Sequence, residues 1–472
     1  MRAATEDALL AAWDATLAGA KEKPALFNTR RKVLRMFPQI EERSRQLGRL
    51  LMDFEAGEVV AIQIGNHVDW PSWLLACLRR RLVVLPLEPT MGAQERATAL
   101  TICRAAAVVA AVPGGTAPEV MPLRRAASTA KNDWGGRPPS LLKLTSGTTA
   151  APRAIRFRSE QLLADCTQVC ETMDITARDL NFAVIPLSHS YGFSNLITPL
   201  LARGIPIVLS LDQMPRAILD DVAATGATVF PGMPVFYQAF CELEEVPKLD
   251  RLRLCISAGA PLSVTVAQKF REKFKQSIHT FYGSSECGGI CYDRDATTSE
   301  EGFVGEPMRG LDLQLLEPNA PSSRVRVRSA AVGDGYFPRP DEEKLGNGFF
   351  IPDDLLRRSA NGFRIVGRIS DVINVAGKKV NPPEVEAALL RFSGVKQAVV
   401  FGRESPLRNE EVAACVVAAA NVRETDLLEF CRRCLSGWQV PKHIFFVQTI
   451  PVNERGKTSR RQLARHFTAR TA

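Results

Sequence analysis

Long apolar runs are missing from this chain. No stretch approaches the 18 or more consecutive apolar residues that a membrane-spanning helix needs. The first 20 residues are partly apolar, but Glu6, Asp7 and Asp14 interrupt them. A secretory signal requires an uncharged apolar segment, so we expect an amphipathic helix here and no signal peptide.

Patterned cysteines and histidines are also missing. The 11 cysteines are odd in number and scattered, whereas a secreted disulfide scaffold has an even and dense set. Cys431 and Cys434 form one CxxC pair, but no second pair follows at the spacing of a zinc ribbon. None of the five histidines belongs to an HExxH motif. We therefore expect reduced, mostly buried thiols and a cytoplasmic protein.

The chain has no internal repeat and no low-complexity segment. Its 472 residues are 46% hydrophobic and 24% charged, enough for a substantial core and roughly three structural units. The net charge is +9, and residues 451–472 contribute six bases and one acid. This tail has one aromatic residue and no nucleic-acid motif, so we interpret it as solvated and attractive to phosphorylated ligands.

Short β-branched runs alternate with helical patterns through the first two thirds of the chain, which is typical of parallel α/β sheets. The expected strands are residues 59–64, 82–85, 107–112, 181–185, 205–209, 228–230, 252–256 and 279–282. The expected helices are residues 69–80, 93–106, 159–172 and 263–274. From about Gly310 the strands shorten and no helix is expected until Pro383, which indicates a small β subdomain and then a C-terminal α+β unit.

A hydroxyl-rich loop follows a short strand at residues 141–154, which read LLKLTSGTTAAPRA. Hydroxyl groups, backbone N–H groups and a flexible glycine suit phosphate oxygens, and Arg153 adds a fixed positive charge. The loop is not a Walker A motif, because GxxxxGK[ST] is absent. The candidate phosphate-binding residues are Thr145, Ser146, Gly147, Thr148, Thr149 and Arg153.

This loop resembles the signature loop of the adenylate-forming superfamily, which includes acyl- and aryl-CoA synthetases, peptide-synthetase adenylation domains and luciferases. Further motifs follow in the family's order. They are PLSHSYGFSN (186–195), FYGSSE (281–286), GFVGEP (302–307), GDGY (333–336), GFFIPDD (348–354) with GRISDVINVAGKKVNPPEVE (367–386), and IPVNERGK (450–457).

The resemblance covers nearly the whole chain and implies a two-domain architecture. A large N-terminal body of parallel-sheet α/β subdomains with a small β subdomain is expected at residues 1–367. A hinge is expected at residues 368–370, and a small mobile α+β lid at residues 371–472.

The chain departs from the family pattern at several positions. Ala150 and Ala154 stand where glycine is usual, and Arg153 where lysine is usual. Asp353 replaces the glycine of a threonine–glycine–aspartate motif, and Asn374 replaces a common lysine. Arginine keeps the charge of lysine but has a different geometry. A non-catalytic nucleotide-binding protein on this fold therefore stays an alternative.

The family's first reaction joins a carboxylate to the α-phosphorus of ATP and expels pyrophosphate, so cations are needed where two anions meet. The resemblance implies Glu286 as a ligand of Mg²⁺ and Lys457 beside the reacting groups. Asp354, with Asp353 as its rival, is expected at the ribose hydroxyls, and Arg368 at the ribose or a phosphate. The other nucleotide-binding residues implied are Gly259, Ala260, Tyr282, Gly283, Ser284 and Ser285.

The second reaction needs a thiol, which CoA or the phosphopantetheine arm of an acyl carrier protein would supply. The resemblance implies a lid that swivels at Ser370 between the two reactions. Gly377 would then line the thiol tunnel, where the lack of a side chain leaves room for pantetheine.

The acid is expected to be aryl or medium-chain acyl. Peptide-synthetase domains usually hold the substrate amine with an aspartate in the motif at residues 186–195, which has no acid here. His189 and Tyr191 match positions that face the acid in aryl-CoA ligases. His189 is also expected to be catalytic. The residues expected at the acid are His189, Tyr191, Gly192, Phe230, Gly232, Gly288 and Gly289. The expected products are acyl-CoA, AMP and pyrophosphate. The sequence does not indicate an oligomeric state.

Overall fold

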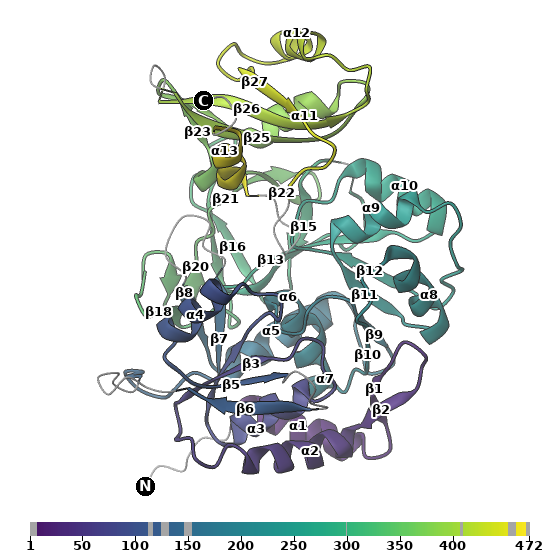
Figure 1. Cartoon of the computed structure of the whole chain (residues 1–472), viewed down its shortest axis with the longest axis vertical. Coiled ribbons are helices and arrows are strands. Elements are labelled where there is room, and N and C mark those ends of the chain that lie inside the picture. The colour runs from purple at the N-terminus through teal and green to yellow at the C-terminus, as the bar shows by residue number, and fades with distance from the viewer. Residues whose placement is uncertain are drawn as a thin grey trace. The chain divides into compact units, whose positions relative to one another are not determined.

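The computed structural model describes residues 7–111, 117–123, 132–145, 153–298, 300–405, 409–451 and 459–468. The chain divides into two compact units. The first, called the body, comprises Met1–Gly147, Ala151–Gln314 and Arg326–Ile351. The second, called the C-terminal unit, comprises Thr148–Ala150, Leu315–Val325 and Pro352–Ala472. Both are mixed α/β structures, as the sequence predicts (Figure 1).

In one sheet of the body the central strands β7, β4, β3 and β5 are parallel. The outer strands β18, β8 and β6 are antiparallel to their neighbours. In order, the strands are β18 (Gly335–Phe337), β8 (Arg153–Phe157), β7 (Leu141–Thr145), β4 (Val83–Pro86), β3 (Val59–Gln63), β5 (Ala105–Ala111) and β6 (Pro118–Pro122). The nearby helices are α2 (Phe37–Arg49), α3 (Trp70–Arg79) and α4 (Ala93–Ile102).

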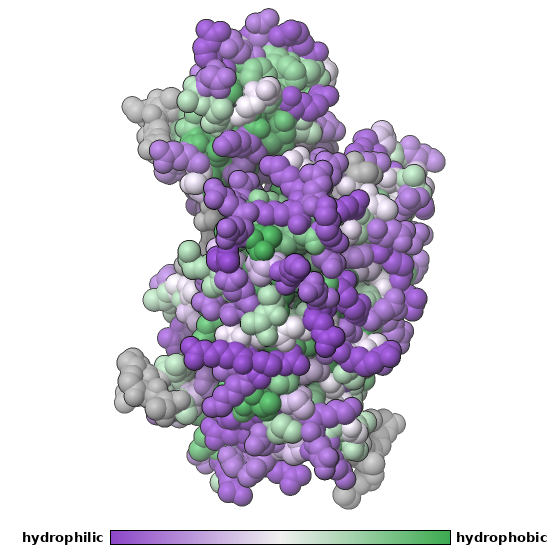
Figure 2. Space-filling view, turned by 90° about the vertical axis from the view of Figure 1, so that its right-hand side faces the viewer, coloured by the Kyte–Doolittle hydropathy of each residue, from purple (hydrophilic) through white to green (hydrophobic). Residues whose placement is uncertain are grey.

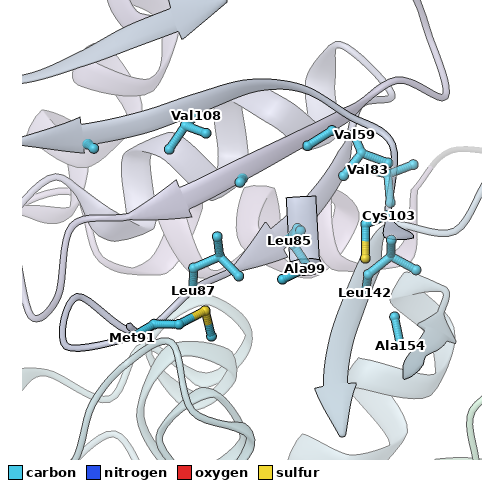
Figure 3. Packing of buried hydrophobic residues seen from close by; sticks show 13 residues of the cluster. Val59, Val83, Leu85, Leu87, Met91, Ala99, Cys103, Val108, Leu142 and Ala154 are labelled. Atoms are coloured by element: carbon cyan, nitrogen blue, oxygen red, sulfur yellow. The ribbon is translucent and has the colours of Figure 1, made fainter. Parts of the chain in front are cut away.

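The core of this sheet is aliphatic. Val59, Val83 and Leu142 are fully buried on neighbouring strands, and Met91 and Ala99 pack against them from the segment around α4 (Figure 3). Parallel strands that alternate with helices are buried on both faces, so they consist largely of apolar residues.

A second sheet of the body carries several of the candidate loops. Strands β1, β10, β9, β11, β12 and β13 are parallel, and β2, β14 and β15 are antiparallel to their neighbours. In order, these strands are β2 (Val33–Met36), β1 (Pro24–Phe27), β10 (Ile207–Leu209), β9 (Asn181–Ala183), β11 (Val229–Gly232), β12 (Leu254–Ser257), β13 (Ile278–Ser284), β14 (Gly288–Tyr292) and β15 (Phe303–Pro307).

Helices of this part of the body pack on one another and on the second sheet, where α5 contacts β14 and α10 contacts β13. They are α1 (Ala8–Gly19), α5 (Ser159–Thr172), α6 (Ser190–Gly192), the π-helix η1 (Phe193–Ile197), α7 (Thr198–Arg203), α8 (Pro215–Thr225), α9 (Pro234–Glu242) and α10 (Val264–Phe274). Shorter strands follow, as expected: β16 (Asp312–Leu315), β17 (Val325–Arg328), β19 (Leu345–Gly346) and β20 (Phe349–Phe350).

From Pro352 the C-terminal unit consists of a hairpin and then a sheet with helices, and its apolar core includes Val385, Val400 and Leu427. The hairpin strands are β21 (Asp354–Ser359) and β22 (Gly362–Arg368). The remaining elements are the 3-10 helix η2 (Ile369–Asp371), β23 (Ile373–Val375), β24 (Lys378–Val380), α11 (Pro382–Leu390), β25 (Val395–Ser405), β26 (Asn409–Ala418), α12 (Glu424–Cys434), β27 (His443–Phe446) and α13 (Arg460–Thr468).

The expected elements are confirmed apart from their ends. Helix α5 has the expected bounds, and each expected strand differs by at most two residues at either end. The helix expected at residues 93–106 is wrong at its end, because α4 stops at Ile102 and β5 begins at Ala105. Arg104 has a left-handed φ of 49°, which ends the helix, and the alanines that follow pair with β3.

The surface is largely hydrophilic on the face seen in Figure 2, where hydrophobic residues form small separate patches. No helix among the described residues is long and apolar enough to cross a membrane. Of the 11 cysteines, all in described positions, nine are buried and none forms a disulfide.

Glu41 is a buried carboxylate that joins three helices of the body. Its Oε2 accepts hydrogen bonds from Trp13 Nε1 at 2.8 Å and Arg79 Nη2 at 2.6 Å, and its Oε1 accepts one from Arg45 Nε at 2.8 Å. Burial by itself raises the pKa of Glu41, but the hydrogen bonds from Trp13 and Arg45 and the charge of Arg79 outweigh it and lower the pKa.

Glu41→Gln should lower the free energy of unfolding by about 1–3 kcal/mol at neutral pH, since a buried charged acceptor is lost. The folded-state pKa lies below the usual 4.5, so the stabilisation is complete above 4.5 and disappears as the pH falls through the folded value. Urea denaturation of the wild-type and Glu41→Gln proteins across this pH range should show that the difference in their free energies of unfolding shrinks as the pH falls. Glu42→Gln, at an exposed position, is the control and should change little.

Candidate active site

Several candidate segments of the body lie at the carboxyl edge of the second sheet. Strands β9, β11, β12 and β13 are parallel, so the segments that follow them lie at one edge, where ligands bind in open α/β sheets. The candidate residues Gly259 and Ala260 follow β12 and are exposed. Gly259 has a φ of 87°, a conformation that favours glycine.

Asn66 holds the segment that leads from β9 into the acid motif. Its Nδ2 donates to the carbonyl oxygen of Ala183 at 3.1 Å and to that of Ile185 at 3.2 Å. Its Oδ1 accepts the backbone N–H of Leu187 at 2.9 Å. Asn66 could not be identified from the sequence, because a single polar residue after a strand is not distinguishable from an ordinary loop residue.

His189 caps the short helix α6. Its Nδ1 accepts the backbone N–H of Tyr191 at 3.2 Å, so the neutral imidazole must carry its proton on Nε2. Tyr191 is buried, its ring centroid lies 5.9 Å from that of Phe281, and its hydroxyl donates to the carbonyl oxygen of Ile256 at 3.4 Å. Burial raises the pKa of Tyr191 well above its usual value, so the ring stays a neutral, apolar surface.

The candidate residues Tyr282 to Ser285 form the end of β13 and the turn into β14. Tyr282 is buried and pairs with Cys291, whereas Gly283 is exposed. A Cβ at Gly283 would lie 2.7 Å from the carbonyl oxygen of Gly288, so the hairpin requires glycine here. The Ser190 hydroxyl donates to Ser285 Oγ at 3.0 Å, which joins the acid motif directly to this turn.

Glu286 lies in the same turn and is held through both carboxylate oxygens. Its Oε1 accepts the hydroxyl of Tyr336 at 3.0 Å, its Oε2 accepts the Ser284 hydroxyl, and its carbonyl oxygen accepts Gly333 N–H at 2.9 Å. Burial, and then the charge of Glu286, raises the pKa of Tyr336, which therefore remains a donor. The GDGY motif thus positions Glu286, a role that the sequence analysis did not identify.

Arg153 has two partners within the body. Its guanidinium lies 4.3 Å from the ring centroid of Tyr336, and its Nη1 lies 3.4 Å from Asp341 Oδ2. The Thr145 hydroxyl donates to the carbonyl oxygen of Arg153 at 3.0 Å, which joins the two ends of the phosphate loop. The remaining loop candidates, Ser146, Gly147, Thr148 and Thr149, and the departure Ala150, lie outside the described residues.

Two of the glycines expected at the acid fit tightly against other parts of the body. A Cβ at Gly192 would lie 2.0 Å from the carbonyl oxygen of Pro186, and one at Gly289 would lie 2.1 Å from Met308 Sδ. Protein atoms therefore occupy the space of the missing side chains at both positions. Their glycines are explained by packing, while their contact with the acid stays a prediction.

Phe230 is a core residue. It is 2% exposed, with ring centroids of Phe182 and Tyr237 each 5.9 Å away. A Cβ at Gly232 would lie 2.6 Å from the Phe230 ring, so this pair packs together at the carboxyl end of β11. Gly288 has a φ of 71° and contacts Asp165, a residue that the sequence analysis also missed.

In the C-terminal unit, Asp354 and Arg368 face each other across the β21–β22 hairpin. Arg368 Nε lies 2.8 Å from Asp354 Oδ1, and the Asp353 carbonyl oxygen accepts the N–H of Ile369 at 2.8 Å. The Ser370 hydroxyl donates to Asp371 Oδ1 at 3.3 Å within η2. The structure therefore brings the two nucleotide candidates of this unit together.

Gly377 occupies the tight turn between β23 and β24. Its φ is 85°, its N–H donates to Asn374 Oδ1 at 2.9 Å, and a Cβ there would meet nothing within 4 Å. The turn requires glycine for its backbone conformation, and the space beside it is open. Lys457 lies outside the described residues.

Known proteins share this arrangement. The family model of the AMP-binding enzyme matches residues 13–337, and that of the AMP-binding enzyme C-terminal domain matches residues 384–457. The chain therefore belongs to the AMP-binding enzyme family. It is an adenylate-forming ligase, which activates a carboxylic acid as an acyl-adenylate.

The sequence identity between this chain and its individual relatives is low. A feruloyl-CoA synthase from Amycolatopsis is 27% identical over 464 residues, which cover 90% of this chain and 93% of that protein. A 3,4-dihydroxybenzoate–[aryl-carrier protein] ligase from Bacillus anthracis is 27% identical over 69% of this chain and 73% of that protein. The crystal structure of ATP-bound MatB from Rhodopseudomonas palustris superposes with a TM-score of 0.84 at 21% identity and covers 98% of this chain and 99% of that chain.

Gly192→Ala should destabilise the body by about 1–3 kcal/mol, because a methyl group would be forced against the Pro186 carbonyl. The shift should also displace His189 and Tyr191 and so lower acid-dependent activity. Urea denaturation measures the first effect. Gly48→Ala, at a helical glycine with nothing within 4 Å of its Cβ position, is the matched control. Equal effects of the two substitutions would contradict the packing argument.

Proposed function

We propose that this enzyme joins a nonpolar carboxylic acid, aryl or medium-chain acyl, to AMP and then transfers the acyl group to the thiol of CoA, with release of AMP and pyrophosphate. The observation that carries the choice of acid is the buried, neutral ring of Tyr191 against Phe281, beside a motif without a carboxylate. An aromatic wall of this kind suits a ring or an alkyl chain.

A carboxylate in contact with the motif supports this choice. Asp165 contacts the acid motif through Ser194, but its two oxygens already accept the Ser194 hydroxyl and the N–H of Gly289. It is 3% exposed, so it is poorly suited to receive the ammonium group of an amino acid. An α-amino acid would therefore gain no partner for its ammonium group from Asp165, and burying an unpaired charge costs free energy.

The acceptor is proposed from the relatives. The feruloyl-CoA synthase matches nearly the whole chain, which favours CoA. The aryl-carrier protein ligase favours the second candidate, a phosphopantetheine arm of a carrier protein, because the same tunnel would serve both thiols. The open space beside Gly377 is compatible with either.

The roles proposed for the charged residues follow from the chemistry. Among the described residues no group of three or more His, Cys, Asp or Glu side chains could hold a metal ion, so Mg²⁺ would be shared between Glu286 and the phosphates of ATP. When bound there, Mg²⁺ would offset phosphate charge. His189 would donate from Nε2 to the acid, Asp354 would bind the ribose, and Lys457 would offset the charge of the reacting carboxylate.

A panel of acids tests the proposal. Aryl acids and medium-chain fatty acids should support ATP–pyrophosphate exchange, whereas α-amino acids should not, because the motif lacks a partner for the amine. Adding CoA or a pantetheinylated carrier protein should then identify the acceptor by its thioester. Exchange with amino acids alone would contradict the choice of acid. Nucleotide binding without exchange for any acid would favour the non-catalytic alternative.

Glu286→Gln should raise the Mg²⁺ concentration needed for half-maximal exchange by about tenfold or more, because the charge is lost while the shape is kept. The hydrogen bond from Tyr336 can persist on the amide oxygen, so thermal unfolding should change little. A magnesium titration of the exchange rate measures the effect. Glu272→Gln, on the exposed side of α10, is the control. Identical titrations for the two variants would remove Glu286 from the metal site.

A further inference from the structure

A polar cavity of about 540 Å³ lies within the body, and this volume is in the range of small-molecule sites. Its lining comes from residues 134–139, 156–161, 329–334 and 347–348, and it includes none of the candidate residues for the nucleotide or the acid. The cavity borders the Phe157 end of the hairpin of β7 and β8, whereas Thr145 and Arg153, which flank the phosphate loop, pair at the opposite end. It is therefore separate from the candidate phosphate site.

Arg156, in β8, brings a positive charge to this cavity without a partner in the part of the chain that the structure describes. No carboxylate there forms an ion pair with it, and its Nε is buried without a hydrogen-bond acceptor. A Cβ at Gly335 in the neighbouring strand β18 would lie 3.3 Å from Arg156 Nη2, so the guanidinium lies against the GDGY segment. A buried N–H group without an acceptor costs free energy, which an anion in the cavity would recover.

Two further arginines line the cavity, and both are paired. Arg158 Nη2 lies 2.6 Å from Asp334 Oδ1, and Arg137 lies 2.6 Å from Glu160 and 4.0 Å from Asp7. The side chains of Arg158 and Arg137 are 44% and 39% exposed, so water screens these ion pairs. Each guanidinium has five N–H donors, which leaves some of them for a ligand. The charges of these two arginines are balanced, and that of Arg156 is not.

The GDGY segment connects the cavity to Glu286. Gly333 and Asp334 line the cavity, and the N–H of Asp334 donates to the carbonyl oxygen of Arg156 at 2.9 Å. The N–H of Gly333 donates to the carbonyl oxygen of Glu286 at 2.9 Å, and the Tyr336 hydroxyl donates to Glu286 Oε1 at 3.0 Å. A ligand held between Arg156 and residues 333–334 would therefore restrain the segment that positions Glu286.

We propose that this cavity is a second anion site, which binds the phosphate group of a small phosphate ester. Arg156 supplies the uncompensated charge, and Arg158 and Gln161 border the same space with further N–H donors. Arginine suits phosphate because its planar donors can bind two oxygens together. Inorganic phosphate shares this chemistry, but the cavity is several times larger than one phosphate group, which favours an ester. Binding restrains Glu286 and so lowers the Mg²⁺ requirement; this coupling rests on the proposed function, whereas the binding does not.

Urea denaturation tests the binding without any substrate. In potassium phosphate at ten times its Kd, the equilibrium constant for folding should rise about elevenfold over potassium chloride of equal ionic strength. Arg156→Gln should lose this gain but unfold normally in chloride, because the arginine has no partner to lose. Arg216→Gln, which breaks an exposed ion pair with Asp220, is the control and should keep the gain. Equal gains in Arg156→Gln and the wild type would overturn the site.

A second variant separates the cavity from the phosphate loop. Arg153→Gln should keep the gain from phosphate, since Arg153 does not line the cavity. Loss of the gain in Arg153→Gln would place the anion at the phosphate loop and overturn the assignment. Glycerol phosphate in place of inorganic phosphate distinguishes the two sources of the anion. The ester should give the same gain at a lower concentration, and a weaker effect of the ester would overturn its choice as the ligand.

A magnesium titration of pyrophosphate exchange tests the coupling. Glycerol phosphate at a saturating concentration should lower the Mg²⁺ concentration for half-maximal exchange at least twofold in the wild type and leave that of Arg156→Gln unchanged. Equal titrations with and without the ester in the wild type would overturn the coupling. A wild-type protein without exchange activity would contradict the proposed function, and the urea measurements would then decide the binding alone.

Discussion

The parallel direction of β9, β11, β12 and β13 is the constraint on which the candidate site depends. The carboxyl ends of parallel strands lie at one edge of the sheet, so residues that are far apart in sequence come close together there. Ser190 and Ser285 come within hydrogen-bond distance only because β9 and β13 share this direction. The helices between the strands supply the return path and the apolar cover.

Close packing fixes the loops once the sheet has brought them together. A Cβ at Gly192 would collide with the carbonyl oxygen of Pro186, and a Cβ at Gly283 would collide with that of Gly288. Such contacts between backbone segments set positions more rigidly than flexible side chains can. His189 then orients its ring through the N–H of Tyr191, and Glu286 through Tyr336 and Ser284. Preorganisation of this kind is what a reaction between two anions requires.

Much of the fold could be predicted from the sequence, because strand and helix alternate with clear periods. The end of α4 could not, since alanines such as Ala105 and Ala106 are compatible with a helix or a buried strand until β3 provides a partner. In the site, the motifs gave the candidates but not their partners. The Arg153–Asp341 and Arg368–Asp354 pairs depend on which strands become neighbours, and sequence spacing does not contain that information.

Lys143 shows why some site neighbours escape sequence analysis. A lysine within LLKL looks like an interruption of an apolar strand, and its aromatic neighbours Phe157 and Phe193 come from other elements. The structure also limits what these cations can do. Arg153 is engaged by Asp341 and Tyr336, and Lys143 is buried beside the rings of Phe157 and Phe193. Neither is well placed to meet an incoming carboxylate, so its charge must be offset by another group. This favours the proposed roles of Mg²⁺ at Glu286 and of Lys457.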